Sequence, residues 1–184
     1  MTEIFFLLVV LLLVTAVWLY NRLIRNRNQV NEAWAGIDVQ LQMRSELVPN
    51  LVQTVKGYAA HESEVLQGVS AVRSGGSSPG TQDIAARAEQ ETKLSRSLGR
   101  LFALAEAYPD LKASKSFQQL HTNLIEIEDQ LQFARRYYNG AVRDNNNLVE
   151  GFPSNVVANM FSFDQAEFFE IELASQRSAP DVDL

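Results

Sequence analysis

The strongest constraint on the fold is an uncharged apolar run at the start of a long helical pattern. The run Ile4 to Tyr20 (IFFLLVVLLLVTAVWLY) contains 17 residues, and the chain has no glycine before Gly36 and no proline before Pro49. As a helix, 17 residues at about 1.5 Å each extend roughly 25 Å, near the lower end of the length that crosses a bilayer. The sequence therefore predicts a transmembrane helix, residues 4–20, that continues rigidly into a helical soluble domain.

The residues that end the run indicate where the helix leaves the membrane. Trp18 and Tyr20 carry amphipathic rings that favour the headgroup region, and three arginines follow, Arg22, Arg25 and Arg27. Because basic residues are retained on the inner side, we expect an outside N-terminus and a soluble domain in the cytoplasm. A periplasmic or extracellular soluble domain stays open as the alternative.

A cleaved signal peptide is the competing interpretation of the apolar run. Such a peptide has a basic segment before the run and small residues at a cleavage site, whereas here only Thr15-Ala16 resembles such a site and no basic residue precedes the run. The sequence thus favours a retained anchor. A lipoprotein anchor needs a cysteine, and the chain has none.

Composition limits what the rest of the chain can be. About 160 residues remain beyond the span, enough for one domain with a sizeable core, which we place at 21–161, followed by an acidic aromatic tail at 162–184. The net charge of -6 argues against a nucleic-acid partner, whose binding surface would be basic. The absence of cysteine excludes disulfides, zinc–thiolate sites and thiol nucleophiles.

Turn-forming residues divide the soluble part into helices. Turn signals occur at 75–80 (GGSSPG), 108–110 (YPD) and 151–154 (GFPS), between stretches rich in helix-forming residues. Apolar residues recur every three or four positions in these stretches, which is typical of helices that pack on one another. The clearest such face in the last long stretch is Phe117, Leu120, Leu124, Ile127, Leu131, Ala134, Tyr138, Ala141, Asn145 and Leu148, with Asn145 its one polar member. The sequence predicts an all-α fold: the transmembrane helix continues into an antiparallel bundle of three long helices, with a short fourth helix, at 28–74, 81–107, 112–150 and 155–161. Pro49 is expected to kink the first of them.

Several motifs resemble those of the bacterial LemA family. The first long helix carries Asn31–Trp34, Ile37–Leu41 and Arg44–Val52, and later Phe133–Asn139 and Phe152–Asn155 are similar to the third-helix and end-of-bundle motifs of that family. The resemblance covers the anchor and nearly all of the bundle. It implies an N-terminally anchored α-helical protein of the bacterial cytoplasmic (inner) membrane, with no established enzymatic activity. One departure is Asp144–Asn147, where family members commonly carry a tyrosine–asparagine pair.

The helix lengths raise the question of what covers the start of the first long helix. That helix would extend roughly 69 Å and the second only roughly 40 Å, so the second would end near the level of Pro49. The apolar stripe formed by Val30, Trp34, Ile37 and Leu41 would then lack cover from it. An exposed stripe of this kind marks an interaction site, so we expect a homo-oligomer assembled there. A bend at Pro49, or cover from residues 108–116, is the alternative.

Polar residues that interrupt the apolar faces are the candidates for chemistry. Counting back from the turn at 75–80 places Glu91 near Glu62, with Arg87 about one turn away and Glu126 or Glu128 at a similar level. Facing carboxylates can hold two metal ions in a helical bundle, but such sites also use Glu-x-x-His pairs. Residues 58 and 118, three before each histidine, are tyrosine and glutamine. We therefore expect an ion-paired layer, and predict no metal, no cofactor and no catalytic residue.

Other motifs point to structure more than to chemistry. His61-Glu62 begins like a zinc-protease motif, but Val65 stands where the second histidine belongs, and the glycines at 75–80 lack the lysine of a phosphate loop. Arg44 interrupts the first apolar face and is expected to pair with Glu46 or with a carboxylate of another helix. A contact across subunits is its alternative role. Trp34 is expected to be a packing or membrane-proximal residue, with partner contact as the lesser option.

The tail interleaves aromatic and acidic residues, with phenylalanines at 161, 163, 168 and 169 and an apolar pair at 171 and 173. It could fold back onto the bundle, which we favour, or bind a partner. The last residues, 175–184, are expected to be mobile.

Three functional classes remain in view. The first is a non-enzymatic, membrane-anchored structural or interaction scaffold that self-assembles and organises envelope proteins. The second is a regulatory adaptor for a membrane enzyme such as a protease, in which the bundle presents Arg135, Arg136 and the tail. The third is an enzyme with an unrecognised carboxylate site, which the sequence barely supports. No nucleic acid and no small-molecule substrate is indicated as a partner.

Overall fold

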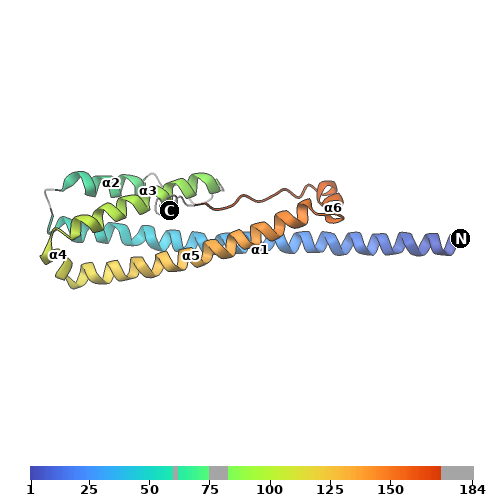
Figure 1. The fold of residues 1–184 in the computed structure, drawn as a ribbon, viewed down its shortest axis with the longest axis horizontal. Coiled ribbons are helices and arrows are strands. Elements are labelled where there is room, and N and C mark those ends of the chain that lie inside the picture. The colour runs from blue at the N-terminus through green and yellow to red at the C-terminus, as the bar shows by residue number, and fades with distance from the viewer. Residues whose placement is uncertain (60–61, 75–82, 171–184) are drawn as a thin grey trace, which may run out of the picture. The chain divides into compact units, whose positions relative to one another are not determined.

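The structure is a computed structural model that describes residues 1–59, 62–74 and 83–170, and these residues form helices and no strand. The helices are α1 (Thr2–Lys56), α2 (Ser63–Ser74), α3 (Ile84–Ala105), α4 (Pro109–Ala113), α5 (Lys115–Glu150) and α6 (Ser154–Met160) (Figure 1). The predicted all-α class and the long N-terminal apolar helix are confirmed.

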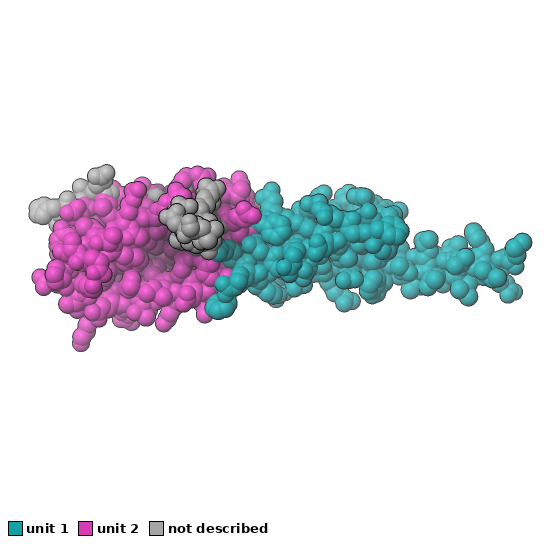
Figure 2. All heavy atoms as spheres, viewed as in Figure 1, with its two compact units in different colours: residues 1–37, 133–168 teal, residues 38–132, 169–184 magenta. Residues whose placement is uncertain are grey.

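The chain forms two compact units, coloured separately in Figure 2. Unit 1 consists of residues 1–37 and 133–168, and unit 2 consists of residues 38–132 and 169–184. Helices α1 and α5 each contribute to both units, so each unit joins segments that are distant in sequence.

The first long helix ends earlier than the sequence predicted. We expected one helix at 28–74, but α1 ends at Lys56 and α2 is a separate helix. The amides of Gly57 and Tyr58 donate to carbonyls only three residues back, at 3.2 and 3.0 Å, and the Tyr58 side chain is 48% exposed. Tightened turns of this kind end a helix, and glycine favours them. Pro49 does not end the helix, since α1 continues through it.

The earlier reversal changes the direction of the helices in unit 2. Because the chain turns back after Lys56, α2 runs antiparallel to α1, and α3 then runs parallel to α1 (Figure 1). The pairs Asp38–Arg87 and Arg44–Glu91 show this, since the residue numbers rise together on both helices. Helix α5 returns antiparallel to both α1 and α3. Unit 2 is thus an up-down-up-down arrangement of four helical segments, where the sequence predicted three.

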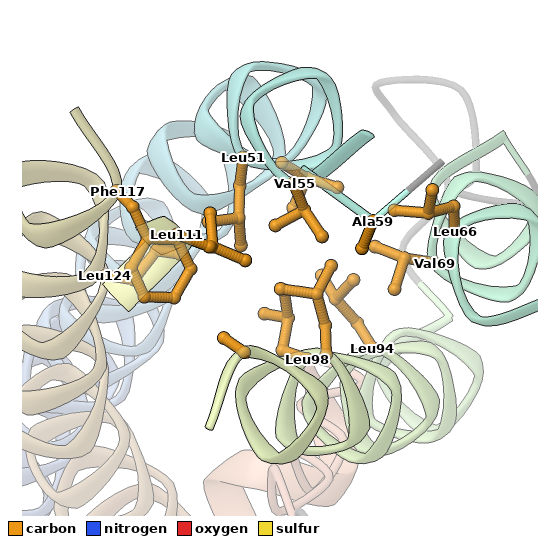
Figure 3. Close-up of a cluster of buried hydrophobic side chains, with 13 residues drawn as sticks. Leu51, Val55, Ala59, Leu66, Val69, Leu94, Leu98, Leu111, Phe117 and Leu124 are labelled. Atoms are coloured by element: carbon orange, nitrogen blue, oxygen red, sulfur yellow. The ribbon is translucent and has the colours of Figure 1, made fainter. Parts of the chain in front are cut away.

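The core of unit 2 is formed by apolar side chains from α1, α2, α3, α4 and α5, which point toward one another in Figure 3. The fully buried members include Leu51 and Val55 of α1, Val69 of α2, Leu101 of α3 and Leu111 of α4. Short helix α4 therefore closes the end of this core between α3 and α5, because its leucine fills the space beside the last turns of α1.

The core of unit 1 forms where α6 packs on α1 and on the last turns of α5. Its buried members are Leu19, Leu23, Leu148, Val157, Ala158 and Phe163. Farther along the same unit, the ring of Trp34 meets that of Tyr138 edge-on, with centroids 5.4 Å apart. Every position of the predicted apolar face on α5 is buried or half-buried, from Phe117 to Leu148, which confirms that face.

A tight turn at Gly151 joins α5 to α6. The Gly151 amide donates to the Asn147 carbonyl at 2.9 Å, and a Cβ at position 151 would lie 2.8 Å from that same oxygen. The Ser154 hydroxyl donates to the Gly151 carbonyl at 2.9 Å as α6 begins. Glycine is therefore required at this turn, because any side chain would push against the backbone of α5.

Candidate functional site

The apolar run is exposed on the described chain. All its residues from Ile4 to Thr15 are solvent-exposed, and only 6% of the most apolar stretch of α1 is buried. A helix from the core of a soluble protein would be mostly buried, so this exposure favours a membrane span. Ala16 already packs against the core of unit 1, and α1 passes without interruption through the cleavage-like Thr15-Ala16. These features support retention of the segment.

Arginines and aromatic rings interact where the run ends. The Arg22 guanidinium lies over the Trp18 ring, 5.4 Å from its centroid, and that of Arg27 lies 5.1 Å from the centroid of Phe163. Tyr20 meets Phe163 edge-on at 5.7 Å. Cation–π contacts of this kind hold long side chains against rings while the charge still reaches water or headgroups. Arginines and aromatic rings therefore pack together at the end of the apolar run, where the sequence predicts that the helix leaves the membrane.

A buried charge cluster lies in unit 2. Arg44 of α1 is 7% exposed at its side chain and faces Glu91 of α3 and Glu128 of α5, with its Nη1 3.5 and 3.0 Å from their carboxylate oxygens. Its Nη2 donates to the Ser95 hydroxyl at 3.1 Å. One guanidinium thus joins three helices. The prediction that Arg44 pairs with a carboxylate of another helix is confirmed.

The surroundings of Glu91 disfavour its charged form. Burial is the largest influence and raises the pKa of this carboxyl, while the nearby Arg44 and Arg87 oppose the rise and Glu128 adds to it. Two carboxylates share one arginine: the Glu91 side chain is 13% exposed, whereas that of Glu128 is 32% exposed. Burial of the Glu91 carboxylate has an energetic cost, which the ion pair with Arg44 offsets.

The direction of α3 explains which predicted neighbours meet. Glu91 and Glu128 lie at one level, as expected, but Glu62 does not join them and instead accepts a hydrogen bond from the Tyr108 hydroxyl at 3.2 Å. The prediction for Glu62 was wrong because it assumed that α3 runs antiparallel to α1. Because α3 runs parallel to α1, Arg87 pairs with Asp38, which lies before Arg44 on α1.

The structure locates some of the remaining candidates for metal or nucleotide binding, and the others lie outside the described residues. Glu126 is exposed. In the described ranges, no three histidine, aspartate or glutamate side chains gather where they could hold a metal ion. His61 and the glycine-rich segment 75–80 lie outside the described residues. His121 stacks on Phe117 with ring centroids 6.1 Å apart, which makes it a packing residue.

The stripe expected to mediate assembly is buried within the chain. Val30 is 8% exposed, Ile37 is fully buried, and Leu41 is 3% exposed. The premise of an uncovered stripe was wrong because it counted only the second long helix as cover. Helix α5 has 36 residues, roughly 54 Å, and its Tyr138 packs on Trp34 in unit 1. Trp34 is thus a packing residue, as expected.

The first part of the tail docks on unit 1. The Tyr138 hydroxyl donates to the Glu167 carbonyl at 2.8 Å, and Asn146 exchanges two hydrogen bonds with the backbone of Ala166. Phe163 and Phe169 are buried, while Phe161 and Phe168 are exposed. The docking alternative therefore holds for residues 163–168. Residues 171–184, which include the predicted apolar pair and mobile end, lie outside the described residues.

Sequence reasoning missed the role of Asn146. This residue belongs to the segment where the chain departs from the LemA-type pattern, and the only local signal was a run of three asparagines. An asparagine on the inner face of a helix can pair with a peptide group as another strand would, since it offers one donor and one acceptor.

One exposed aromatic pair stands out on α5. Phe133 is 61% and Tyr137 is 55% exposed, one helical turn apart, and the Arg136 guanidinium lies 4.5 Å from the centroid of the Phe133 ring. Arg135, its neighbour, is half-buried. Of the two arginines considered for partner binding, Arg136 is therefore the more accessible.

The fold and the exposed N-terminal run define a class of protein: an all-α, membrane-associated helical bundle whose first helix carries the anchor. The LemA family matches residues 33–184, which is most of the chain, so this protein belongs to the LemA family. The predicted family is thereby confirmed.

Relatives of this chain have names from two groups. Magnetosome protein MamQ 2 of Paramagnetospirillum magneticum is 26% identical over 186 residues, which cover 88% of this chain and 68% of that protein. Protein LemA of Metamycoplasma hominis is 28% identical over 163 residues, which cover 89% of this chain and 73% of that protein. Magnetosome protein MamQ of Magnetospirillum gryphiswaldense is 23% identical, over 82% of this chain and 64% of that protein. None of these names denotes an enzymatic reaction.

Proposed function

We propose that this protein is a non-enzymatic scaffold, anchored in the bacterial cytoplasmic membrane by one transmembrane helix. It holds its helical bundle beside the membrane and organises further copies of itself or other envelope proteins. The observation that carries the proposal is that α1 is both the anchor and a core helix. Its residues 4–15 are exposed, whereas from Leu19 onward one face of the same helix is buried, at Leu19, Leu23, Val30, Ala33, Ile37, Leu41, Val48, Leu51 and Val55. The bundle is thus held at the membrane without a flexible tether.

The arginines after the span favour a cytoplasmic bundle, because Arg22, Arg25 and Arg27 lie directly past the apolar run. Since Val30, Ile37 and Leu41 are buried within the chain, assembly has to use other surfaces. The exposed Phe133 and Tyr137 are available on α5 for this purpose. Two of the relatives are named as proteins of a magnetosome, which supports an organising role at a membrane structure.

The mass of the full-length protein in mild detergent or membrane discs tests the scaffold. We expect several copies per particle, or one partner chain in fixed proportion, at the concentration used. A double variant, Phe133→Ser with Tyr137→Ser, should reduce the particle mass, while Ile125→Ser, at a similarly exposed residue on α5, should not. Single copies without a partner would contradict the scaffold.

The adaptor is the second candidate, and the exposed Arg136 beside Phe133 favours it. A guanidinium next to an aromatic ring is a common centre of protein interfaces, since both residue types are enriched there. If the protein is an adaptor, purification returns one enzyme in fixed proportion, and Arg136→Glu abolishes its recovery. Recovery that is unchanged in Arg136→Glu contradicts this role for Arg136.

A further inference from the structure

Helix α6 has one buried face and one exposed apolar face. Ser154, Val157 and Ala158 are buried, which is the spacing of a single helical side. The opposite side and the two flanks expose large apolar side chains, and we call these the α6 apolar face: Phe152 (85% exposed), Val156 (59%), Met160 (74%) and Phe161 (55%). A contiguous set of exposed apolar residues marks a binding surface.

The stretch that carries the α6 apolar face has no charge. Residues 151–162 contain no aspartate, glutamate, lysine or arginine. This composition is unusual for a surface turn of a soluble domain, where charged side chains normally maintain solubility. It fits a surface that is removed from water in the cell.

Packing places this surface at the end of the membrane span. The partners of α6 in unit 1 include Leu19 and Leu23 of α1, and the Tyr20 and Phe161 rings meet edge-on with centroids 4.8 Å apart. Leu23 follows the last residue of the apolar run by three positions, about 4.5 Å along the helix. The headgroup region of one leaflet is roughly 5–7 Å thick. The α6 apolar face therefore lies at the depth of the headgroups if the run spans the bilayer.

We propose that the α6 apolar face inserts into the headgroup region of the same membrane, as a second lipid contact of this chain. The occupant is lipid and not a protein, because Phe161 of this face contacts Tyr20, the last residue of the apolar run. Residues typical of the interface lie at the same level of α1, where Trp18 is 57% exposed with Arg22 against its ring. Such an attachment would fix how the bundle rotates about its anchor. This inference rests on the proposed membrane anchoring.

The absence of cysteine makes a direct test simple, because one introduced cysteine carries one fluorescent label. Full-length protein with Met160→Cys is labelled and reconstituted in vesicles of phosphatidylcholine and phosphatidylglycerol that contain lipids with a nitroxide quencher near the headgroup. The matched control is Tyr137→Cys, an exposed aromatic position in the same unit. Its neighbour Tyr138 packs on Trp34, which lies about 21 Å along α1 from Tyr20. Leu12→Cys, inside the span, is read with a quencher deep in the lipid chain.

We expect the label at position 160 to lose most of its fluorescence and the label at position 137 to lose little. Quenching at position 12 without quenching at position 160 overturns this inference and leaves the anchor intact. No quenching at either position overturns the anchor as well. A second variant, Phe152→Asp with Val156→Asp, should release the label at position 160 from the quencher. Because both residues are exposed, the α-helical signal of the variant should match that of the wild type.

Discussion

The side-chain amide of Asn146 forms two hydrogen bonds with Ala166: its Nδ2 donates to the Ala166 carbonyl at 2.9 Å, and its Oδ1 accepts from the Ala166 amide at 2.8 Å. Both backbone groups of one tail residue are thus satisfied by one helix residue. This matters because residues 163–168 are extended and have no strand partner in the described chain to satisfy them.

Asn146→Asp should detach this segment. The carboxylate still accepts from the Ala166 amide but repels the Ala166 carbonyl, so we expect a cost of about 1–3 kcal/mol that acts on the segment. Hydrogen exchange should speed up in peptides that cover residues 163–168 and stay unchanged in those that cover Leu94 to Leu101. The control is Asn147→Asp, at an exposed side chain on the same turn. Equal effects of the two substitutions would show that the paired hydrogen bonds do not hold the segment.

Tyr138→Phe should weaken the same attachment and change its dependence on pH. Burial raises the pKa of Tyr138 to about 12, and the Glu167 carboxylate adds to the rise. Because the pKa of Tyr138 is higher in the folded state than in the unfolded state, the protonated hydroxyl stabilises the fold. This contribution is complete below about pH 10 and is lost as the pH rises toward 12. The wild type should lose more stability than Tyr138→Phe over that interval. The control is Tyr137→Phe, at an exposed tyrosine that should behave as the wild type does.

Arg44→Met should destabilise unit 2 by about 3 kcal/mol, because it leaves the largely buried Glu91 without its cation, while Glu128, 32% exposed, still reaches water. Thermal unfolding would measure this loss. Arg100→Met, at an exposed arginine on α3, should change the melting temperature little. The triple variant Arg44→Met, Glu91→Gln, Glu128→Gln should recover much of the loss, since no buried charge of this cluster remains. A triple variant as unstable as the single one would mean that packing by the Arg44 stem dominates.

The Arg44→Met variant should also become relatively more stable in acid. Burial already raises the pKa of Glu91, and the loss of Arg44 removes the largest influence that lowers it. A carboxyl with a raised pKa in the folded state contributes stability below its ordinary value, and that stability is lost as the pH rises through the raised pKa. The difference between the variant and the wild type should therefore shrink as the pH falls from 7 toward 4.5. A difference independent of pH would contradict the role assigned to Glu91.

Gly151→Ala should destabilise the turn between α5 and α6. The added methyl would lie 2.8 Å from the Asn147 carbonyl oxygen, so the backbone must shift, at a cost of about 1–3 kcal/mol. Gly140→Ala is the matched control, since no atom lies within 4 Å of its added methyl, and it should stabilise α5 by about 0.5–1 kcal/mol. Denaturant unfolding of both variants measures the contrast. Equal effects would show that the turn tolerates a side chain.

Periodicity predicted the parts of the fold that depend on a single helix face. The apolar face of α5 was predicted residue by residue, because helical spacing alone decides which side chains point inward. The end of α1 was missed because Tyr58 and Val65 continue the same spacing across the break. Gly57 was the local signal, and its weight as a helix-ending residue was underestimated.

The site was harder to predict because it depends on the direction of helices. A charged residue within an apolar face identified Arg44 as a member of an ion pair, but its partners could be found only once α3 was known to run parallel to α1. The partner of Asn146 was harder still to predict, since Ala166 lies 20 residues away in a segment without periodicity. Contacts of this kind have no local pattern that could reveal them.

The division of α1 and α5 between two units sets an order for biosynthesis. The described apolar core of unit 2 lies within residues 38–132, so this core can form before residues 133–184 have been made. Unit 1 joins residues 1–37 to residues 133–168, and its Leu19 and Leu23 must wait for α6 to emerge from the ribosome. Until then, Leu19 and Leu23 of α1 are without the α6 side chains that cover them in the folded chain.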